Sequence, residues 1–186
     1  MPFSITRNKD THQAHTIMGC EVMGREHPDF YAMRLVSNLL GGPAMSARLN
    51  VALREKAGLV YTVESILSVY PDRGVWQTYF GCDPKDTERC RHLVEREIQH
   101  LITTPLSPSQ LHTAQKQFKG QLGISSSMQE QHAIAMAKSF ALYGEATDLQ
   151  EVFRHIDALT AADLQRVTRE WIAPDKLSIL TYKPTE

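Results

Sequence analysis

The stretch LLGGPAMSARLNVALREKAGLVYTV, from Leu39 to Val63, holds a glycine-broken turn, a short amphipathic segment and a β-rich run in direct succession. We predict a helix that ends at Gly58, a residue suited to a left-handed cap, and a strand that follows at once. Arg54 lies near the end of this helix and Tyr61 near the start of the strand. Both side chains are long and polar, so we expect them to point into the same space at the helix-to-strand junction.

The composition is that of an ordinary globular protein. The chain has 186 residues and a formal net charge of -1, with acidic and basic residues mixed along it. This length fits one domain with a sizeable core. A basic face, which binding to a phosphate backbone requires, is missing, so nucleic acid is excluded as a partner.

The cysteines and the length of the apolar runs indicate the cellular compartment in which the protein is expected. Cys20, Cys82 and Cys90 are odd in number and widely spaced, which indicates buried or surface thiols and neither a disulfide framework nor a zinc knuckle. No apolar run approaches the roughly 20 residues that span a bilayer, so no membrane segment is expected. The first residues lack the apolar core of a signal peptide. We expect a cytoplasmic protein, with the periplasm and the mitochondrial matrix left open because a domain from a longer protein would look the same.

The pattern of apolar residues and turn signals predicts an α+β fold. Residues 1–11 are polar and are expected to be a flexible lead-in, followed by a single domain over residues 12–186. Predicted strands cover residues 12–23, 59–70, 75–82 and 177–182, the middle two forming a hairpin. Predicted helices cover residues 28–41 and 49–57, a long segment from residue 86, a segment opened by a capping box at 107–110, one ending at Gly144, and residues 149–159 and 160–171. This order favours a two-layer sandwich, a mainly antiparallel sheet with helices packed on one face.

The opening stretch resembles the second, non-zinc-binding domain of the pitrilysin/insulinase zinc peptidases, a group that includes the mitochondrial processing peptidases. The matching residues are Ser46, Arg48, Leu49, Leu53, Arg54, Glu55, Lys56, Gly58, Leu59 and Tyr61. The end of the chain is also similar to that domain, through Tyr143-Gly144, residues 156–164, and Pro174-Asp175 before the last strand. The resemblance covers roughly residues 12–184 and implies a two-layer α+β domain.

The zinc site of that family, a helical His-x-x-Glu-His with a distant Glu, is absent from this chain. The nearest approach is His92-Leu93-Val94-Glu95-Arg96, where a guanidinium stands in place of the second imidazole and cannot ligate a metal. A solvated helix face is the better interpretation. His12 and His15 lie three residues apart on a predicted strand and would point to opposite faces. We assign no chemistry to the solitary histidines His100, His112, His132 and His155, and Gly41-Gly42 indicates the end of a helix.

Arg54 and Tyr61 are the candidate site residues. The resemblance implies that both reach a peptide bound in a cleft between this domain and a zinc-bearing one. A tyrosine hydroxyl can donate to the oxyanion that develops on the scissile carbonyl, and an arginine can hold a peptide carbonyl or carboxylate. In the structural alternative, Arg54 pairs with a nearby acid and Tyr61 packs in the sheet.

Three functions follow from these features. In the first, the chain is the non-catalytic half of a zinc-dependent peptidase, binds no cofactor itself, and works with a zinc-bearing catalytic domain, in the same polypeptide or in a partner chain, on a peptide substrate. Alone it is predicted to be inactive. In the second, it is a structural or assembly subunit like the core proteins of the respiratory bc1 complex. In the third, it is a free peptide-binding module that uses a sheet edge or groove. A homodimer is compatible with any of them.

Overall fold

The computed structural model describes residues 1–146 and 148–185, the side chain of Gln131 aside. It contains one five-stranded sheet in the order β1-β5-β2-β4-β3, in which β1 runs parallel to β5 and the other neighbours are antiparallel. The predicted α+β class with a mainly antiparallel sheet is confirmed. The strands are β1 (Ser4–Lys9), β2 (Ala14–Met23), β3 (Val60–Val69), β4 (Arg73–Cys82) and β5 (Ser178–Pro184).

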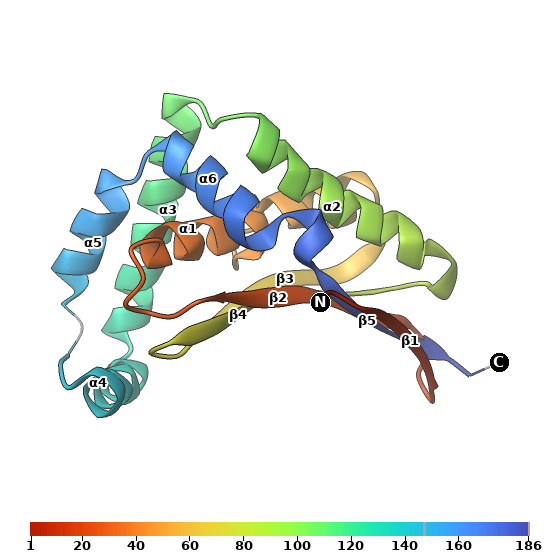
Figure 1. Ribbon diagram of the computed structural model, residues 1–186, viewed down its shortest axis with the longest axis horizontal. Helices are drawn as coiled ribbons and strands as arrows, with labels where there is room; N and C mark the ends of the chain where they lie inside the picture. Colours follow the sequence, from red (N-terminus) through yellow and green to blue (C-terminus); the bar gives the residue numbers. More distant parts are fainter. Residues whose placement is uncertain (147, 186) are drawn as a thin grey trace.

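Helices pack on one face of this sheet. Figure 1 shows α1, α2 and α6 above the strands, α3 and α5 beside α1, and α4 near the end of the sheet where the β3–β4 hairpin turns. Among the described residues, no helix covers the opposite face of the sheet, and none is long and apolar enough to cross a membrane. The helices are α1 (Phe30–Gly41), η1 (Asn50–Lys56), η2 (Pro84–Asp86), α2 (Thr87–Thr103), α3 (Pro108–Ser127), α4 (Gln129–Tyr143), α5 (Leu149–Ala158), α6 (Ala161–Ile172) and η3 (Pro174–Lys176).

The core lies between the sheet and the helices. Alternate residues of a strand point to opposite faces, and on β4 this places Trp76 and Phe80 toward the helices, both without exposed surface. Burying a side chain of this size contributes about 1.5–3 kcal/mol. The helical side of the core comes from fully buried residues of α1, α2, α5 and α6: Met33, Leu35, Val36, Leu40, Cys90, Val94, Ile98, Ile156, Val167 and Ile172.

The predicted flexible lead-in is corrected by the structure, because Ser4–Lys9 form strand β1. All six residues are exposed, and the strand is held by its parallel pairing with β5, from Ser4 opposite Ile179 to Lys9 opposite Pro184. Backbone hydrogen bonds to β5 hold this strand, and Lys9 also lies over the Tyr182 ring. Because none of its side chains is buried, the strand lacks the alternation of buried and exposed side chains from which a strand is predicted.

An ion pair between a buried carboxylate and a partly exposed guanidinium ties the start of α1 to α6. Asp29, the residue before α1, is 6% exposed and accepts hydrogen bonds from Arg166 Nη2 at 2.6 Å, Arg166 Nη1 at 3.0 Å and Trp171 Nε1 at 3.2 Å. The sequence predicts an acid near the positive end of this helix. The position is as predicted, but the carboxylate bonds to α6 and caps no backbone N–H of α1. The Arg166 guanidinium lowers the pKa of Asp29 below its ordinary value, and Trp171 adds to this effect.

Replacing Asp29 with Asn should lower the free energy of unfolding by about 1–3 kcal/mol near pH 7, because hydrogen bonds to charged groups contribute about that much. The pKa of Asp29 is depressed in the folded state. The contribution of its carboxylate is therefore complete above the unfolded pKa of about 3.9 and is lost as the pH falls through the folded pKa. Urea unfolding at pH 7 and at successively lower pH measures the free energy of unfolding. The difference in this free energy between wild type and Asp29→Asn should become smaller as the pH falls.

Asp175→Asn is the matched control, since Asp175 is exposed in η3, and it should leave stability almost unchanged. If the difference in the free energy of unfolding between wild type and Asp29→Asn stays constant down to pH 3, ionisation of the Asp29 carboxylate does not contribute to stability as predicted.

Candidate functional site

The site begins at helix η1, which connects the end of α1 to β3. The predicted helix is present, but it is wound as a π-helix over Asn50–Lys56. It closes with Gly58 N donating to Arg54 O at 3.0 Å and Leu59 N donating to Leu53 O at 2.9 Å. Gly58 has φ +65°, which confirms the predicted left-handed cap. Single π-helical turns occur often at functional sites.

The apolar stripe of η1 anchors it and turns Arg54 outward. Leu49 and Leu53 have no exposed surface, and Ala52 is 4% exposed, as the helical spacing predicts. Arg54 lies on the other side, and its side chain is 47% exposed. The motif residue Arg48 has a structural contact instead, because its Nη2 lies 3.1 Å from Glu97 of α2.

A β-bulge in β3 falls at Tyr61, whose side chain is exposed to solvent. Val60 lies opposite Cys82 and Val63 opposite Phe80, so β3 advances three residues while β4 advances two. The extra residue falls at Tyr61 and Thr62. Bulges bend a strand and re-aim side chains, and Tyr61 is 83% exposed. It is therefore not packed within the sheet.

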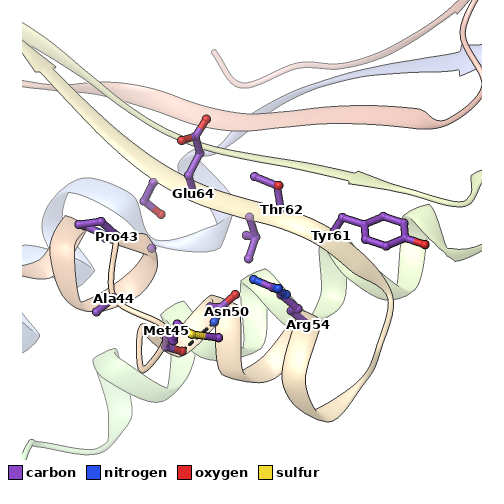
Figure 2. Close-up of a pocket in the computed structure, with 12 residues that line it drawn as sticks. Pro43, Ala44, Met45, Asn50, Arg54, Tyr61, Thr62 and Glu64 are labelled. Carbon is purple, nitrogen blue, oxygen red and sulfur yellow. Dashed lines mark hydrogen bonds between the residues drawn. The ribbon is translucent and has the colours of Figure 1, made fainter.

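Arg54 and Tyr61 both line one hollow between the end of α1, η1 and β3, with a volume of about 340 Å³. Figure 2 shows the Arg54 side chain reaching from η1 toward β3, whereas the Tyr61 ring extends along the strand away from the Arg54 guanidinium. The structure brings both predicted residues to the same hollow without bringing them into contact. The rest of the lining is Gly41, Gly42, Pro43, Ala44, Met45, Asn50, Thr62, Val63, Glu64 and Ser65.

The hollow carries both signs of charge. Arg54 Nε lies 3.9 Å from Glu55 Oε1, and both side chains are about half exposed. Such an ion pair contributes little and leaves the guanidinium free to rearrange. Glu64 of β3 also lines the hollow, and Asn50 Nδ2 donates to Met45 O at 2.7 Å, which holds the loop before η1 in place (Figure 2).

Gly41 lines the hollow at the point where α1 approaches β3, and sequence reasoning missed this close approach. Helix α1 ends at Gly41, as predicted. In addition, a Cβ on Gly41 would lie 2.6 Å from Ser65 N and 2.5 Å from Ser65 Oγ. The absent side chain lets the end of α1 approach β3. The glycine pair signals a helix end in the sequence, but a contact with a strand 24 residues further on leaves no local signal.

The other histidine motifs, for which no metal site is predicted, lie outside this hollow. His92 is exposed on α2 and lies 3.3 Å from Glu95. His12 precedes β2, which begins at Ala14 instead of residue 12, while His15 contacts the Tyr79 hydroxyl of β4 at 2.8 Å. Across residues 1–146 and 148–185, no group of three or more His, Cys, Asp or Glu residues could hold a metal ion.

The cysteines are free thiols, as predicted, with Cys82 and Cys90 buried and Cys20 partly buried. Burial raises the pKa of Cys20 to about 11, so its thiol is protonated near neutral pH and is a poor nucleophile.

A family model described as "Peptidase M16 inactive domain" matches residues 2–118, more than half of the chain. Among curated proteins, an uncharacterised zinc protease of Bacillus subtilis is 30% identical over 163 residues, covering 88% of this chain and 39% of the relative. The β subunit of the mitochondrial-processing peptidase of Blastocladiella emersonii is 25% identical over 187 residues, covering 97% of this chain and 40% of that protein. The chain thus spans about two fifths of the length of these relatives.

A chain in the structure of complex III2 from Candida albicans superposes with a TM-score of 0.84 over 98% of this chain and 46% of that chain, at 18% identity. At this identity the likeness shows a shared fold alone.

We expect Gly41→Ala to lower the free energy of unfolding by about 1–3 kcal/mol, because the new methyl group must push the end of α1 away from the backbone of Ser65. Thermal or urea unfolding measures the change. Gly120→Ala in α3 is the matched control, since a Cβ there meets no atom within 4 Å, and it should stabilise the chain by about 0.5–1 kcal/mol. Equal stability of Gly41→Ala and wild type would show that the approach of α1 to β3 is not tight.

Proposed function

The chain belongs to the peptidase M16 inactive-domain family, and we propose that it forms the non-catalytic half of a zinc-dependent peptidase whose zinc site lies in another domain or chain. Membership of this family confirms the resemblance that the motif around Arg54 indicated. The B. subtilis relative is named a zinc protease and is more than twice as long as the matched region. The proposal depends on one observation: Arg54 and Tyr61 line the same hollow, of about 340 Å³, beside β3 at the edge of the sheet.

Arg54 is proposed to bind the peptide. Its guanidinium reaches into a hollow whose volume lies within the range of small-ligand sites. The planar fork can donate two parallel hydrogen bonds to a carboxylate or a single one to a backbone carbonyl. Glu64 on the same lining can accept a hydrogen bond from a peptide N–H. A bound extended segment would therefore find one donor and one acceptor at this place.

Tyr61 is proposed to stabilise the transition state. Its phenol can donate a hydrogen bond to the oxygen that gains negative charge as water attacks the scissile carbonyl. The ring extends out of the hollow and is 83% exposed, so its hydroxyl is available to a substrate held by a facing domain. The zinc ion, bound by that other domain, would supply the activated water. This chain would hold the peptide through Arg54 and donate the Tyr61 hydrogen bond to the developing oxyanion.

A structural or assembly role is the second candidate function, because the His-x-x-Glu-His zinc motif is absent from this chain and a chain of complex III2 shares its fold. The presence of both Arg54 and Tyr61, exposed and at one hollow, favours the peptidase role. The sequence of the parent polypeptide upstream of this chain, and of neighbouring genes, separates the peptidase role from the structural role. A His-x-x-Glu-His motif in either of them supports the peptidase role. Its absence from the parent and from the neighbours favours the structural role.

The experiment for the peptidase role combines the chain with its zinc-bearing domain and follows hydrolysis of a quenched fluorescent peptide. Tyr61→Phe should lower kcat by roughly 100- to 1000-fold, the effect of removing one oxyanion donor. Arg54→Ala should lower kcat/KM by roughly 10- to 100-fold, as expected for losing a hydrogen bond from a charged group. The chain alone should show no zinc-dependent hydrolysis.

Tyr70→Phe and Arg89→Ala serve as matched controls, because Tyr70 is exposed at the β3–β4 turn and Arg89 is exposed on α2. Both should retain wild-type activity. If Tyr61→Phe and Arg54→Ala also match wild type, the assignment of these residues is wrong.

A further inference from the structure

A second, larger hollow lies in the helical layer, away from Arg54 and Tyr61. It has a volume of about 620 Å³ and is enclosed by α1, α3, α4, α5 and the end of β3. Most of its wall is apolar, with contributions from Phe30, Leu67, Val69, Leu122, Met136 and Leu142. On α4, Met136 is 40% exposed and Leu142 is 50% exposed, so this helix leaves an open, apolar side to the hollow.

The Arg and Lys side chains are the charged groups among the described residues that line this hollow. Arg25, Arg34 and Lys138 line it, and its described lining includes no Asp or Glu. The guanidiniums of Arg25 and Arg34 lie 5.4 and 5.5 Å from the centroid of the same ring, that of Phe30. Arg34 also lies 5.4 Å from the Phe118 ring. Two like charges are thus held near each other on an aromatic surface.

Among the cations of this hollow, Arg34 would gain most from a bound anion. Its side chain is partly buried in α1, and the interactions described for it are with the faces of aromatic rings. Burial lowers the pKa of Arg34, and the neighbouring charge of Arg25 lowers it further, while Tyr31 opposes this. Desolvating a cation without an opposite charge is costly. A bound carboxylate would offset that cost.

We propose that this hollow binds a carboxylate that carries an apolar chain, with the carboxylate on Arg34 and the chain along α3 and α4. The planar guanidinium fork matches a carboxylate in a bidentate geometry. The wall of Leu122, Met136 and Leu142 offers apolar surface to the chain, and the volume lies in the range of pockets that enclose small molecules. The proposal does not rest on the peptidase role, because it uses none of the residues that line the hollow of Arg54 and Tyr61. A third hollow, of about 350 Å³, borders both, since it shares Arg34 with this one and Ser65 with the other.

The test is isothermal titration calorimetry of the purified chain with three probes. Decanoate has both the charge and the chain, decanol has the chain alone, and acetate has the charge alone. Decanoate should bind at least tenfold more tightly than either of the others. Arg34→Met, which keeps length and apolar character, should weaken decanoate binding by tenfold or more and leave decanol binding unchanged.

Arg89→Met is the matched control on the exposed side of α2, and its decanoate affinity should equal that of wild type. If Arg34→Met does not fold, the comparison of the three probes on the wild-type chain and on Arg34→Lys decides the question. Equal affinities for decanoate and decanol, no measurable decanoate binding, or unchanged decanoate affinity in a folded Arg34→Met would each overturn the proposal.

Discussion

The pairing of β4 with β2 on one side and β3 on the other determines the position of the other elements. The two ladders put Trp76 and Phe80 on the helical side of the sheet, where both are fully buried. Since a strand alternates its side chains between faces, a slip of one residue would turn both rings to solvent. Their burial therefore holds the register, and the register determines where β3 must accommodate its extra residue at Tyr61 and Thr62. The position of helix η1 depends on the same core, because Leu53 is buried in it. The position of Leu53 in turn determines where Arg54, the next residue, lies.

The candidate site consequently combines a rigid base with an exposed rim. The base consists of the buried Leu49 and Leu53 of η1 and the close approach of Gly41 to Ser65. The rim consists of the side chains of Arg54, Tyr61 and Glu64, which face solvent. Exposed side chains on a firm backbone are suited to contacts with a second body. The larger hollow differs, because two of its cations, Arg25 and Arg34, are held against an aromatic ring of the helical layer.

Much of this arrangement could be predicted from sequence, since its signals are local. The cap at Gly58, the capping box of Ser107 and Gln110, and the helix end at Gly144 depend on residues within one turn, and all three are present. The assignment of Arg54 and Tyr61 as site residues came from a motif and stays a prediction, while the structure shows that both line one hollow. The bulge and the direction of the Tyr61 ring could not be predicted, because they depend on the register with β4. Strand β1 was missed because none of its side chains is buried, and the second hollow because its wall comes from segments far apart in the chain.

The two outer strands of the sheet also bear on edge-to-edge aggregation. An unpaired strand edge offers hydrogen-bonding groups to any neighbouring chain, and natural sheets blunt such edges with charges, bulges or short strands. Strand β1 covers the edge of β5 and carries Arg7 and Lys9 on exposed positions. At the other side of the sheet, the bulge interrupts the ladder of β3 near Tyr61. The irregularity that presents this tyrosine to solvent therefore also makes the edge of β3 a poorer template for aggregation.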